Sequence, residues 1–227
     1  MAEQKNYALI VAGGSGSRMN ATVPKQFLLL NEKPVLMHTI ERFYHYDNAM
    51  EIIVVLPEAQ FQLWESLCHK HNFTIQHRLV AGGSVRSESV KNGLAEIKDE
   101  GVAAIHDGVR PLVSFETIGR CFEVAALKGN AIPVMPVIES LRMIDGEKSK
   151  AVDRSSFVTI QTPQVFSISE IKKAYNQPFS EAFTDDASVL EAAGSAINLV
   201  EGNIENIKIT HPADLLFAGM LIKNREH

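Results

Sequence analysis

The segment "AGGSGSRMNATVPKQF" follows an apolar run near the start of the chain, and its residue types are suited to holding phosphate groups. Backbone N–H groups can approach a phosphate closely at Gly13, Gly14 and Gly16, because glycine has no Cβ. Two cations, Arg18 and Lys25, stand in the same segment, which contains no acidic residue. The segment is therefore predicted to bind a phosphate chain through its amides and both cations.

Two common phosphate-binding motifs do not fit this segment. A P-loop needs a second glycine five residues after its first, and Met19 stands there when Gly14 is taken as the first. The dinucleotide fingerprint G-x-G-x-x-G begins well with Gly14 and Gly16 but also ends on Met19. An NAD-dependent oxidoreductase would further need an acid about 20 residues later, whereas Glu58 follows the second apolar run much farther along. The sequence therefore disfavours an oxidoreductase.

Asp107 is a candidate ligand for Mg²⁺. It ends the apolar run "VAAIHD", which predicts a carboxylate at the carboxyl end of a strand, where ligands bind in α/β folds. Mg²⁺ commonly takes one or two carboxylates and completes its shell with phosphates and water. An aspartate that only bonds to the turn "GVR" is the alternative, and Arg110, three residues on, could pair with it.

The elements that must position these residues alternate along the chain. Apolar runs rich in β-branched residues predict strands, and apolar residues at helical spacing predict helices. Such alternation predicts right-handed βαβ units, and so a single Rossmann-like α/β domain over 1–227 with a mostly parallel twisted sheet flanked by helices. The expected strands are 7–13, 51–57, 74–80, 102–107, 130–138, 196–202 and 206–210, and the expected helices are 34–43, 61–68, 90–97, 118–125, 167–176, 185–194 and 212–223.

Residues 138–160 interrupt this alternation. Asp145-Gly146, a hairpin-turn dipeptide, separates two segments of mixed polarity. An isolated hairpin is marginal in water, so a protruding β-hairpin arm that packs on the sheet or on a partner subunit is expected. A flexible surface loop is the alternative.

Composition excludes several classes of protein. The net charge is −5, from 22 basic and 27 acidic residues, and without a long basic run the chain is not expected to bind nucleic acid. No apolar run approaches the ~20 residues of a membrane span, and the start "MAEQKN" does not resemble a signal peptide, so a cytoplasmic protein without a membrane anchor is expected. Cys68 and Cys121 have no C-x-x-C spacing and are expected to be buried thiols.

The order of motifs across nearly the whole chain resembles a known family of nucleotidyltransferases. The family is the 2-C-methyl-D-erythritol 4-phosphate cytidylyltransferases of the non-mevalonate isoprenoid pathway. The ribitol-5-phosphate cytidylyltransferases share several motifs but normally differ around "TDDASVLE", so the first family is preferred. The motifs are "GGSGSRM", "PKQF", "HDGVRPLV" at 106–113, "IQTPQVF" at 160–166, "TDDASVLE" at 184–191 and "EGNIENIKIT" at 201–210.

The resemblance implies that the substrate phosphate attacks the α-phosphorus of CTP and expels pyrophosphate, with Mg²⁺ as cofactor. Arg18 and Lys25 would stabilise the transition state, since this transfer depends on positioning and charge neutralisation. His106 is assigned a structural role, because a phosphate nucleophile needs no proton removed near neutral pH. A non-catalytic nucleotide-binding protein, which would bind CTP without releasing pyrophosphate, is a more distant alternative.

The resemblance also implies two sets of binding residues. Relatives often carry Asp where Ser84 stands and Thr where Ser140 stands. Because Arg154 lies on the expected arm, it would enter the site of a neighbouring subunit, which implies a homodimer. The implied nucleotide-binding residues are Ala12, Gly13, Gly14, Gly16, Gly83, Ser84, Ser89, Asp107 and Arg110, and those for the polyol phosphate are Ser140, Arg154, Thr162, Thr184 and Lys208.

Asp185 and Asp186 precede a segment with helical spacing. Carboxylates are favoured at a helix N-terminus, so both are expected to begin a helix. A second metal site, or a contact from Asp185 to the polyol, stays open from the sequence.

Overall fold

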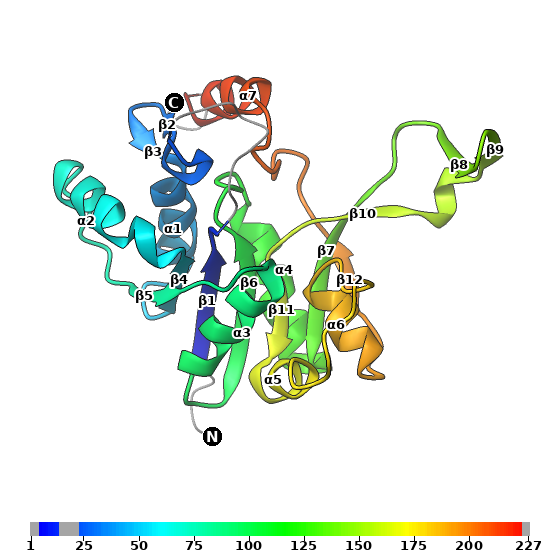
Figure 1. The fold of residues 1–227 in the computed structure, drawn as a ribbon, viewed down its shortest axis with the longest axis horizontal. Helices are drawn as coiled ribbons and strands as arrows, with labels where there is room; N and C mark the ends of the chain where they lie inside the picture. The colour runs from blue at the N-terminus through cyan, green and yellow to red at the C-terminus, as the bar shows by residue number, and fades with distance from the viewer. Residues whose placement is uncertain (1–4, 14–22, 224–227) are drawn as a thin grey trace.

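A computed structural model of the chain describes residues 5–13 and 23–223 and shows one central β-sheet with helices on both faces (Figure 1). The sheet has eight strands in the order β10-β7-β11-β6-β1-β4-β5, with β12 beside β7. The strands are β1 (Lys5–Val11), β4 (Glu51–Leu56), β5 (Arg78–Ala81), β6 (Gly101–Asp107), β7 (Asn130–Pro136), β10 (Val158–Ile160), β11 (Gln164–Ser167) and β12 (Leu199–Glu201).

Most neighbouring strands run parallel, as the sequence predicts. The pairs β1–β4, β1–β6, β4–β5 and β7–β12 are parallel. The short strand β11 lies between β6 and β7 and is antiparallel to both, and β10 is antiparallel to β7. The alternation of apolar runs did not predict β10 or β11, because Gln161, Thr162 and Pro163 interrupt the apolar run between them.

The strand expected at 206–210 is wrong. This segment has no regular secondary structure, and the Ile209 N–H donates to the Val109 carbonyl at 2.9 Å. The apolar residues Ile207 and Ile209 instead pack in a cluster with Leu30, Val109 and neighbours outside the sheet. The alternation of apolar residues therefore indicated correctly that these side chains are buried, but the segment does not pair as a strand.

The helices form two layers. Those on one face are α1 (Val35–Tyr46), α2 (Phe61–Lys70) and α4 (Phe115–Lys128), and those on the other are α3 (Arg86–Glu96), α5 (Ile168–Ala174) and α6 (Asp186–Ala192). Strand β1 serves both layers, because Ala8 and Ile10 face the first and Leu9 and Val11 face the second. The last helix, α7 (Pro212–Lys223), lies against β2 (Leu29–Leu30), which pairs with β3 (Lys33–Pro34).

A β-hairpin is present within the range expected for the arm. Strands β8 (Leu141–Asp145) and β9 (Lys148–Val152) pair around Gly146, whose φ of 56° requires a residue that tolerates the left-handed region. Figure 1 shows this hairpin projecting away from the sheet and its helices. Its side chains are largely exposed in the single chain, including Ile144 at 71%.

Both cysteines are free thiols. Cys121 is buried, as expected, whereas Cys68 is only partly buried. Burial raises the pKa of Cys68 to about 11 and that of Cys121 to about 12, so both stay protonated near neutral pH. Within the described ranges, no helix has the length and apolar character needed to cross a membrane.

The close packing of α3 on the sheet gives a testable prediction. A Cβ at Gly93 would overlap Leu9 and lie 2.9 Å from Cγ2 of Val55, whereas one at Gly119 in α4 would lie 3.6 Å from the Tyr46 hydroxyl. Gly93→Ala should lower the free energy of unfolding by about 1–3 kcal/mol through overpacking. Gly119→Ala is the matched control and should raise it by about 0.5–1 kcal/mol through helix propensity. Urea unfolding measures both, and a Gly93→Ala protein as stable as wild type would contradict the packing described.

Candidate functional site

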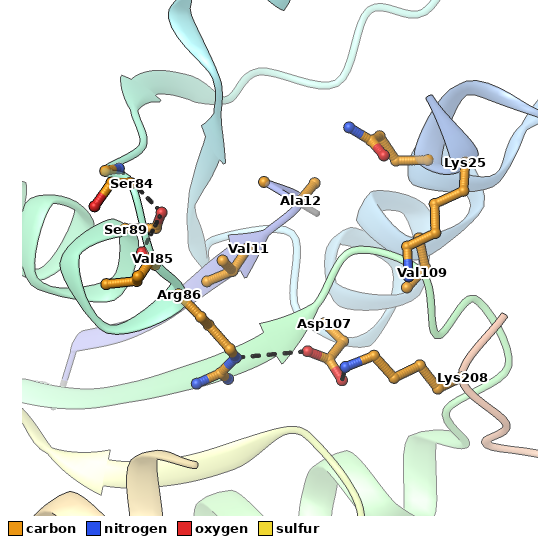
Figure 2. A pocket seen from close by; sticks show the side chains of 13 residues that line it. Val11, Ala12, Lys25, Ser84, Val85, Arg86, Ser89, Asp107, Val109 and Lys208 are labelled. Carbon is orange, nitrogen blue, oxygen red and sulfur yellow. Dashed lines mark hydrogen bonds and ion pairs between the residues drawn. The ribbon is translucent and has the colours of Figure 1, made fainter. Parts of the chain in front are cut away.

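A cavity of about 330 Å³ opens at the carboxyl ends of β1 and β6 (Figure 2). Ligands in parallel α/β sheets bind at this edge, and the volume falls in the range of small-molecule sites. Five segments contribute: the end of β1, the 3₁₀ helix η2 (Lys25–Phe27), the loop before α3 with the start of that helix, the end of β6 with the turn after it, and the segment before α7. The lining residues are Val11, Ala12, Gly13, Lys25, Gln26, Gly83, Ser84, Val85, Arg86, Ser89, Asp107, Val109 and Lys208.

The Asp107 carboxylate is the centre of charge in this cavity. Its Oδ2 lies 3.1 Å from Nζ of Lys208 and 3.1 Å from Nε of Arg110, and its Oδ1 lies 3.8 Å from Nε of Arg86. Figure 2 shows Arg86 and Lys208 reaching it from opposite sides. Burial by itself would raise the pKa of Asp107, but Lys208, Arg86 and Arg110 outweigh burial and hold the pKa well below its usual range. The carboxylate is therefore ionised at any pH where the protein works.

His106 and Thr162 support Asp107 from beneath. The Asp107 N–H donates to Oγ1 of Thr162 at 3.1 Å, and Oγ1 lies 3.0 Å from Nδ1 of His106. His106 Nε2 lies 3.0 Å from the Arg110 carbonyl, which can only accept, so Nε2 carries the ring proton and Nδ1 accepts from the Thr162 hydroxyl. Burial lowers the pKa of His106 to about 4, which keeps the ring neutral. These bonds support the structural role expected for His106.

Arg110 contacts Asp107 without lining the cavity. Its Nη1 donates to the Asn206 carbonyl at 2.7 Å while its Nε bonds to Asp107, and its side chain is 13% exposed. Arg110 is not among the lining residues. In this structure it orients Asp107 and anchors the segment that leads to Lys208.

The loop before α3 uses its own N–H groups internally. The Gly83 N–H donates to Oγ of Ser89 at 3.1 Å, and that hydroxyl donates to the Val85 carbonyl at 3.1 Å. The N–H and the hydroxyl of Ser84 both donate to Oε2 of Glu88 at 2.8 Å. The N–H groups of Gly83 and Ser84 are therefore both bonded to side chains of α3.

Two lysines border the cavity on segments far apart in sequence. Lys25 lies on η2 directly after Pro24, and Lys208 lies on the segment before α7 (Figure 2). Ala12 and Gly13, directly after β1, form one wall of the cavity. The Ala12 N–H already donates to the Val55 carbonyl at 2.9 Å. The remaining residues expected at this wall, Gly14, Gly16 and Arg18, lie outside the described residues.

Of the residues expected to bind the polyol phosphate, only Lys208 lines the cavity. Thr162 is 6% exposed and lies beneath Asp107. Thr184 borders a small neighbouring pocket beside Arg86. Ser140 and Arg154 belong to the exposed arm, and the Arg154 guanidinium donates to the Ile138 carbonyl within it. A single chain therefore does not bring this set together.

Sequence reasoning missed Arg86 and Asp186 as a pair. Arg86 Nη1 and Nη2 donate to Oδ1 and Oδ2 of Asp186 at 2.9 and 2.6 Å, across 100 positions of sequence. Asp185 and Asp186 do begin α6, and Asp185 caps it by accepting from the Ser188 N–H. The sequence did contain a signal for this pair, because Arg86 lies in the first turn of a helix. The helix dipole disfavours a cation there, which indicates that a carboxylate from elsewhere in the chain lies close to it.

The fold and this cavity define a class of protein. A parallel α/β sheet with a nucleotide-sized cavity at its carboxyl edge, bordered by two lysines and an ionised aspartate, is typical of α/β proteins that bind phosphorylated nucleotides.

Comparisons with known proteins identify the family within this class. The IspD family model, described as 2-C-methyl-D-erythritol 4-phosphate cytidylyltransferase, matches residues 7–224. Curated proteins of that name from Porphyromonas gingivalis and Bacteroides fragilis are 53% and 52% identical over 221 and 215 residues. The matches cover 97% and 95% of this chain and 99% and 98% of those proteins. The chain belongs to the 2-C-methyl-D-erythritol 4-phosphate cytidylyltransferase family.

Solved structures agree with this assignment. The 4-diphosphocytidyl-2C-methyl-D-erythritol synthase from Anaerococcus prevotii matches with a TM-score of 0.82 at 25% identity, covering 97% of this chain and 96% of that one. The 2-C-methyl-D-erythritol 4-phosphate cytidylyltransferase from Thermus thermophilus matches with a TM-score of 0.78 at 29% identity, covering 97% and 99%.

The buried neutral ring of His106 predicts a pH dependence of stability. Because the folded pKa is about 4 and the ordinary value is 6.5, the unfolded chain binds the extra proton first as the pH falls. The stabilisation is complete above about pH 6.5 and is lost toward about pH 4. The free energy of unfolding of wild type minus that of His106→Gln should therefore fall by about 2 kcal/mol between about pH 7 and about pH 5.

Urea unfolding of both proteins at the two pH values measures this change. The exposed His45→Gln variant is the control for loss of an imidazole at the surface. A gap between wild type and His106→Gln that stays constant with pH would show that the ring is not held neutral.

Proposed function

We propose that this protein transfers the cytidylyl group of CTP to 2-C-methyl-D-erythritol 4-phosphate, giving 4-diphosphocytidyl-2-C-methyl-D-erythritol and pyrophosphate in isoprenoid precursor biosynthesis. Its membership of the family, over residues 7–224, supports both substrates. The observation that carries the proposal is the cavity at the carboxyl ends of β1 and β6, which Lys25, Lys208 and the ionised Asp107 line together.

The reaction requires little bond-making by the protein. An oxygen of the acceptor phosphate forms a bond to the α-phosphorus of CTP, and the bond from that phosphorus to the oxygen bridging to the β-phosphorus breaks. The electron pair of the broken bond leaves with pyrophosphate. Because the attacking oxygen is already anionic near neutral pH, no general base is needed. The task of the site is to bring two anions together and to neutralise the charge that builds on the phosphorus oxygens.

The cations around the cavity suit this task. Lys25 approaches from η2, and by family resemblance Arg18 accompanies it on the triphosphate. Lys208 reaches in from the other side, where the acceptor phosphate would lie. Its Nζ lies 3.1 Å from Asp107 and its side chain is 40% exposed, so it is held in place but accessible to an incoming phosphate. Asp107 thus prevents Lys208 from turning into solvent before the acceptor binds.

Mg²⁺ is proposed as the cofactor. Within residues 5–13 and 23–223, no three His, Cys, Asp or Glu side chains gather as a metal site, so phosphate oxygens would have to supply most ligands. Asp107 fits a role as the protein ligand, since it lines the cavity, is ionised, and has Oδ1 at an ion-pair distance of 3.8 Å from Arg86, longer than a hydrogen bond. When bound, Mg²⁺ would offset charge on the triphosphate.

A homodimer is proposed as the working form. Exposed apolar side chains on and beside the arm, including Ile138 at 69% and Ile144 at 71%, support burial against a second copy. Arg154 lies on this arm and, by family resemblance, would complete the acceptor site of the neighbouring subunit. A cytoplasmic place of action is proposed as well, because substrates and products are multiply charged phosphate esters that do not cross membranes unaided.

Release of pyrophosphate tests the proposed reaction. With Mg²⁺ and CTP, turnover is expected with 2-C-methyl-D-erythritol 4-phosphate and not with ribitol 5-phosphate. Lys25→Ala should lower kcat on the order of 10²- to 10³-fold, as for the loss of one donor to a developing anion. Lys70→Ala, at the exposed end of α2, is the control for loss of a lysine. Turnover with ribitol 5-phosphate alone would reassign the acceptor, and CTP binding without pyrophosphate release would indicate a binding protein.

Mixing two inactive variants tests the exchanged arm. If Arg154 acts in the partner's site, a heterodimer of Lys25→Ala and Arg154→Ala subunits contains one site in which both residues are intact. Random reassembly of equal amounts should then restore about a quarter of the wild-type sites. Sedimentation establishes the dimer independently. No recovered activity in a mixture shown to contain heterodimers would mean that Arg154 acts within its own chain, and full activity of Arg154→Ala by itself would mean that Arg154 has no role.

A further inference from the structure

Arg86 and Asp186 form a charge pair whose carboxylate is fully buried. The two nitrogens Nη1 and Nη2 of Arg86 meet the two oxygens of Asp186 at 2.9 and 2.6 Å, which is the bidentate geometry of a strong charge-assisted pair. The Asp186 side chain is 0% exposed and that of Arg86 is 32% exposed. Such a pair fixes the direction of the arginine as well as its distance, because two parallel bonds leave the guanidinium little freedom to rotate.

Asp186 is itself held rigidly. The Tyr175 hydroxyl donates to its Oδ1 at 2.6 Å. On either side of it, Gln164 binds the start of α6 through both ends of its amide: Nε2 donates to Asp185 at 2.8 Å, and Oε1 accepts from the Ala187 N–H at 2.9 Å. Gln164 is 0% exposed and lies on β11, in the middle of the sheet. The carboxylate that receives Arg86 is therefore anchored to the sheet.

Arg86 is also the first residue of α3, directly after the loop that borders the cavity at Gly83 and Ser84. Its remaining nitrogen, Nε, points toward Oδ1 of Asp107 at 3.8 Å. Burial would lower the pKa of Arg86, but Asp186 and Asp107 outweigh burial and hold the pKa above its usual range. All three nitrogens thus face carboxylates of this chain, so the side chain connects two protein groups and is not a vacant anion site.

We propose that Arg86 is a positioning residue that clamps the start of α3 to Asp186, and thereby fixes the loop at Gly83 and Ser84 relative to Asp107. The loop would border the base of CTP, and Asp107 would border the reacting phosphates. The clamp therefore fixes the position of the base relative to that of the α-phosphorus. This inference rests on the proposed function and on the family resemblance, which implies that Gly83 and Ser84 bind the nucleotide. It explains why a cation occupies the first turn of α3, where the helix dipole by itself disfavours one.

Lysine cannot replace this clamp. It presents a single ammonium on a flexible stem, and so it can balance the charge of Asp186 without fixing the direction of approach. The loop would keep its internal bonds from Ser84 to Glu88 and from Gly83 to Ser89, but would lose its fixed position as a unit. A small displacement of this kind lowers the rate of a reaction that depends on alignment.

The test is Arg86→Lys, assayed with CTP and with UTP. The expected result is a decrease in kcat/KM for CTP of roughly 10- to 100-fold, with a decrease in the ratio of kcat/KM for CTP to that for UTP. The ratio matters because partial unfolding lowers both values equally and leaves the ratio unchanged. Arg78→Lys is the matched control: Arg78 also contacts two carboxylates, Glu51 and Glu96, but is 46% exposed on β5 outside the cavity. Its kinetics should stay within about twofold of wild type.

Tyr175→Phe provides a second variant that keeps every charge. It removes the hydrogen bond that orients Asp186 and retains the buried ring, so it should fold and shift the CTP-to-UTP ratio in the same direction by a smaller factor. Circular dichroism verifies that each variant is folded at the assay temperature. An unchanged ratio in both folded variants, whether or not the rates fall, would overturn the positioning role.

Calorimetric titration with CTP and UTP, without acceptor, separates this inference from the proposed function. If wild type binds CTP in preference to UTP but releases no pyrophosphate, the proposed function fails while the clamp is still tested by the binding ratio. Loss of preference in Arg86→Lys and retention in Arg78→Lys would support the clamp. The same preference for CTP over UTP in wild type, Arg86→Lys and Arg78→Lys would refute the clamp.

Discussion

One buried carboxylate organises the charged side of this molecule. Asp107 lies at the end of β6 and contacts Lys208, Arg110 and Arg86, which come from three separate segments of the chain. A buried carboxylate with this many cationic neighbours stays ionised, and each neighbour is restrained by it in turn. The arrangement concentrates positive charge at one edge of a chain whose net charge is −5, which suits a site for two anionic substrates.

The neutral groups beneath Asp107 are as important as the cations around it. Thr162 and His106 connect its backbone to the Arg110 carbonyl, so the carboxylate is positioned by the sheet as well as by its ion pairs. Gln164 does the same for the start of α6. Strand β11, which carries Gln164, lies between β6 and β7, so the antiparallel strand joins the side of the sheet that borders the cavity to the side that carries the arm. Each of these buried polar groups is bonded, as burial of polar atoms requires.

Much of the fold could be predicted from the sequence. The runs at 51–57 and 102–107 became β4 and β6, and the helices came where apolar residues recur at helical spacing. Gly146 lies in the turn of a hairpin, with Asp145 as the last residue of the strand before it. These are local signals, set by side-chain periodicity and turn chemistry. The segment at 206–210 was predicted wrongly because apolar alternation reports which side chains are buried and does not name their neighbours. Strands β10 and β11 were not predicted, because polar residues and Pro163 interrupt the apolar run that contains them.

The sequence by itself determined the chemistry available: the glycine-rich segment, the cations Lys25 and Lys208, and a carboxylate that ends a strand. Only the tertiary structure decided which groups meet. It paired Arg86 with Asp186 across 100 positions and bonded Arg110 to the Asn206 carbonyl. It also buried Thr162 beneath Asp107, and it bonded the N–H groups of Gly83 and Ser84 to side chains of α3. The physical reason is that residue type fixes what a group can bind, whereas its partner depends on which distant segments the packed core brings within hydrogen-bonding distance.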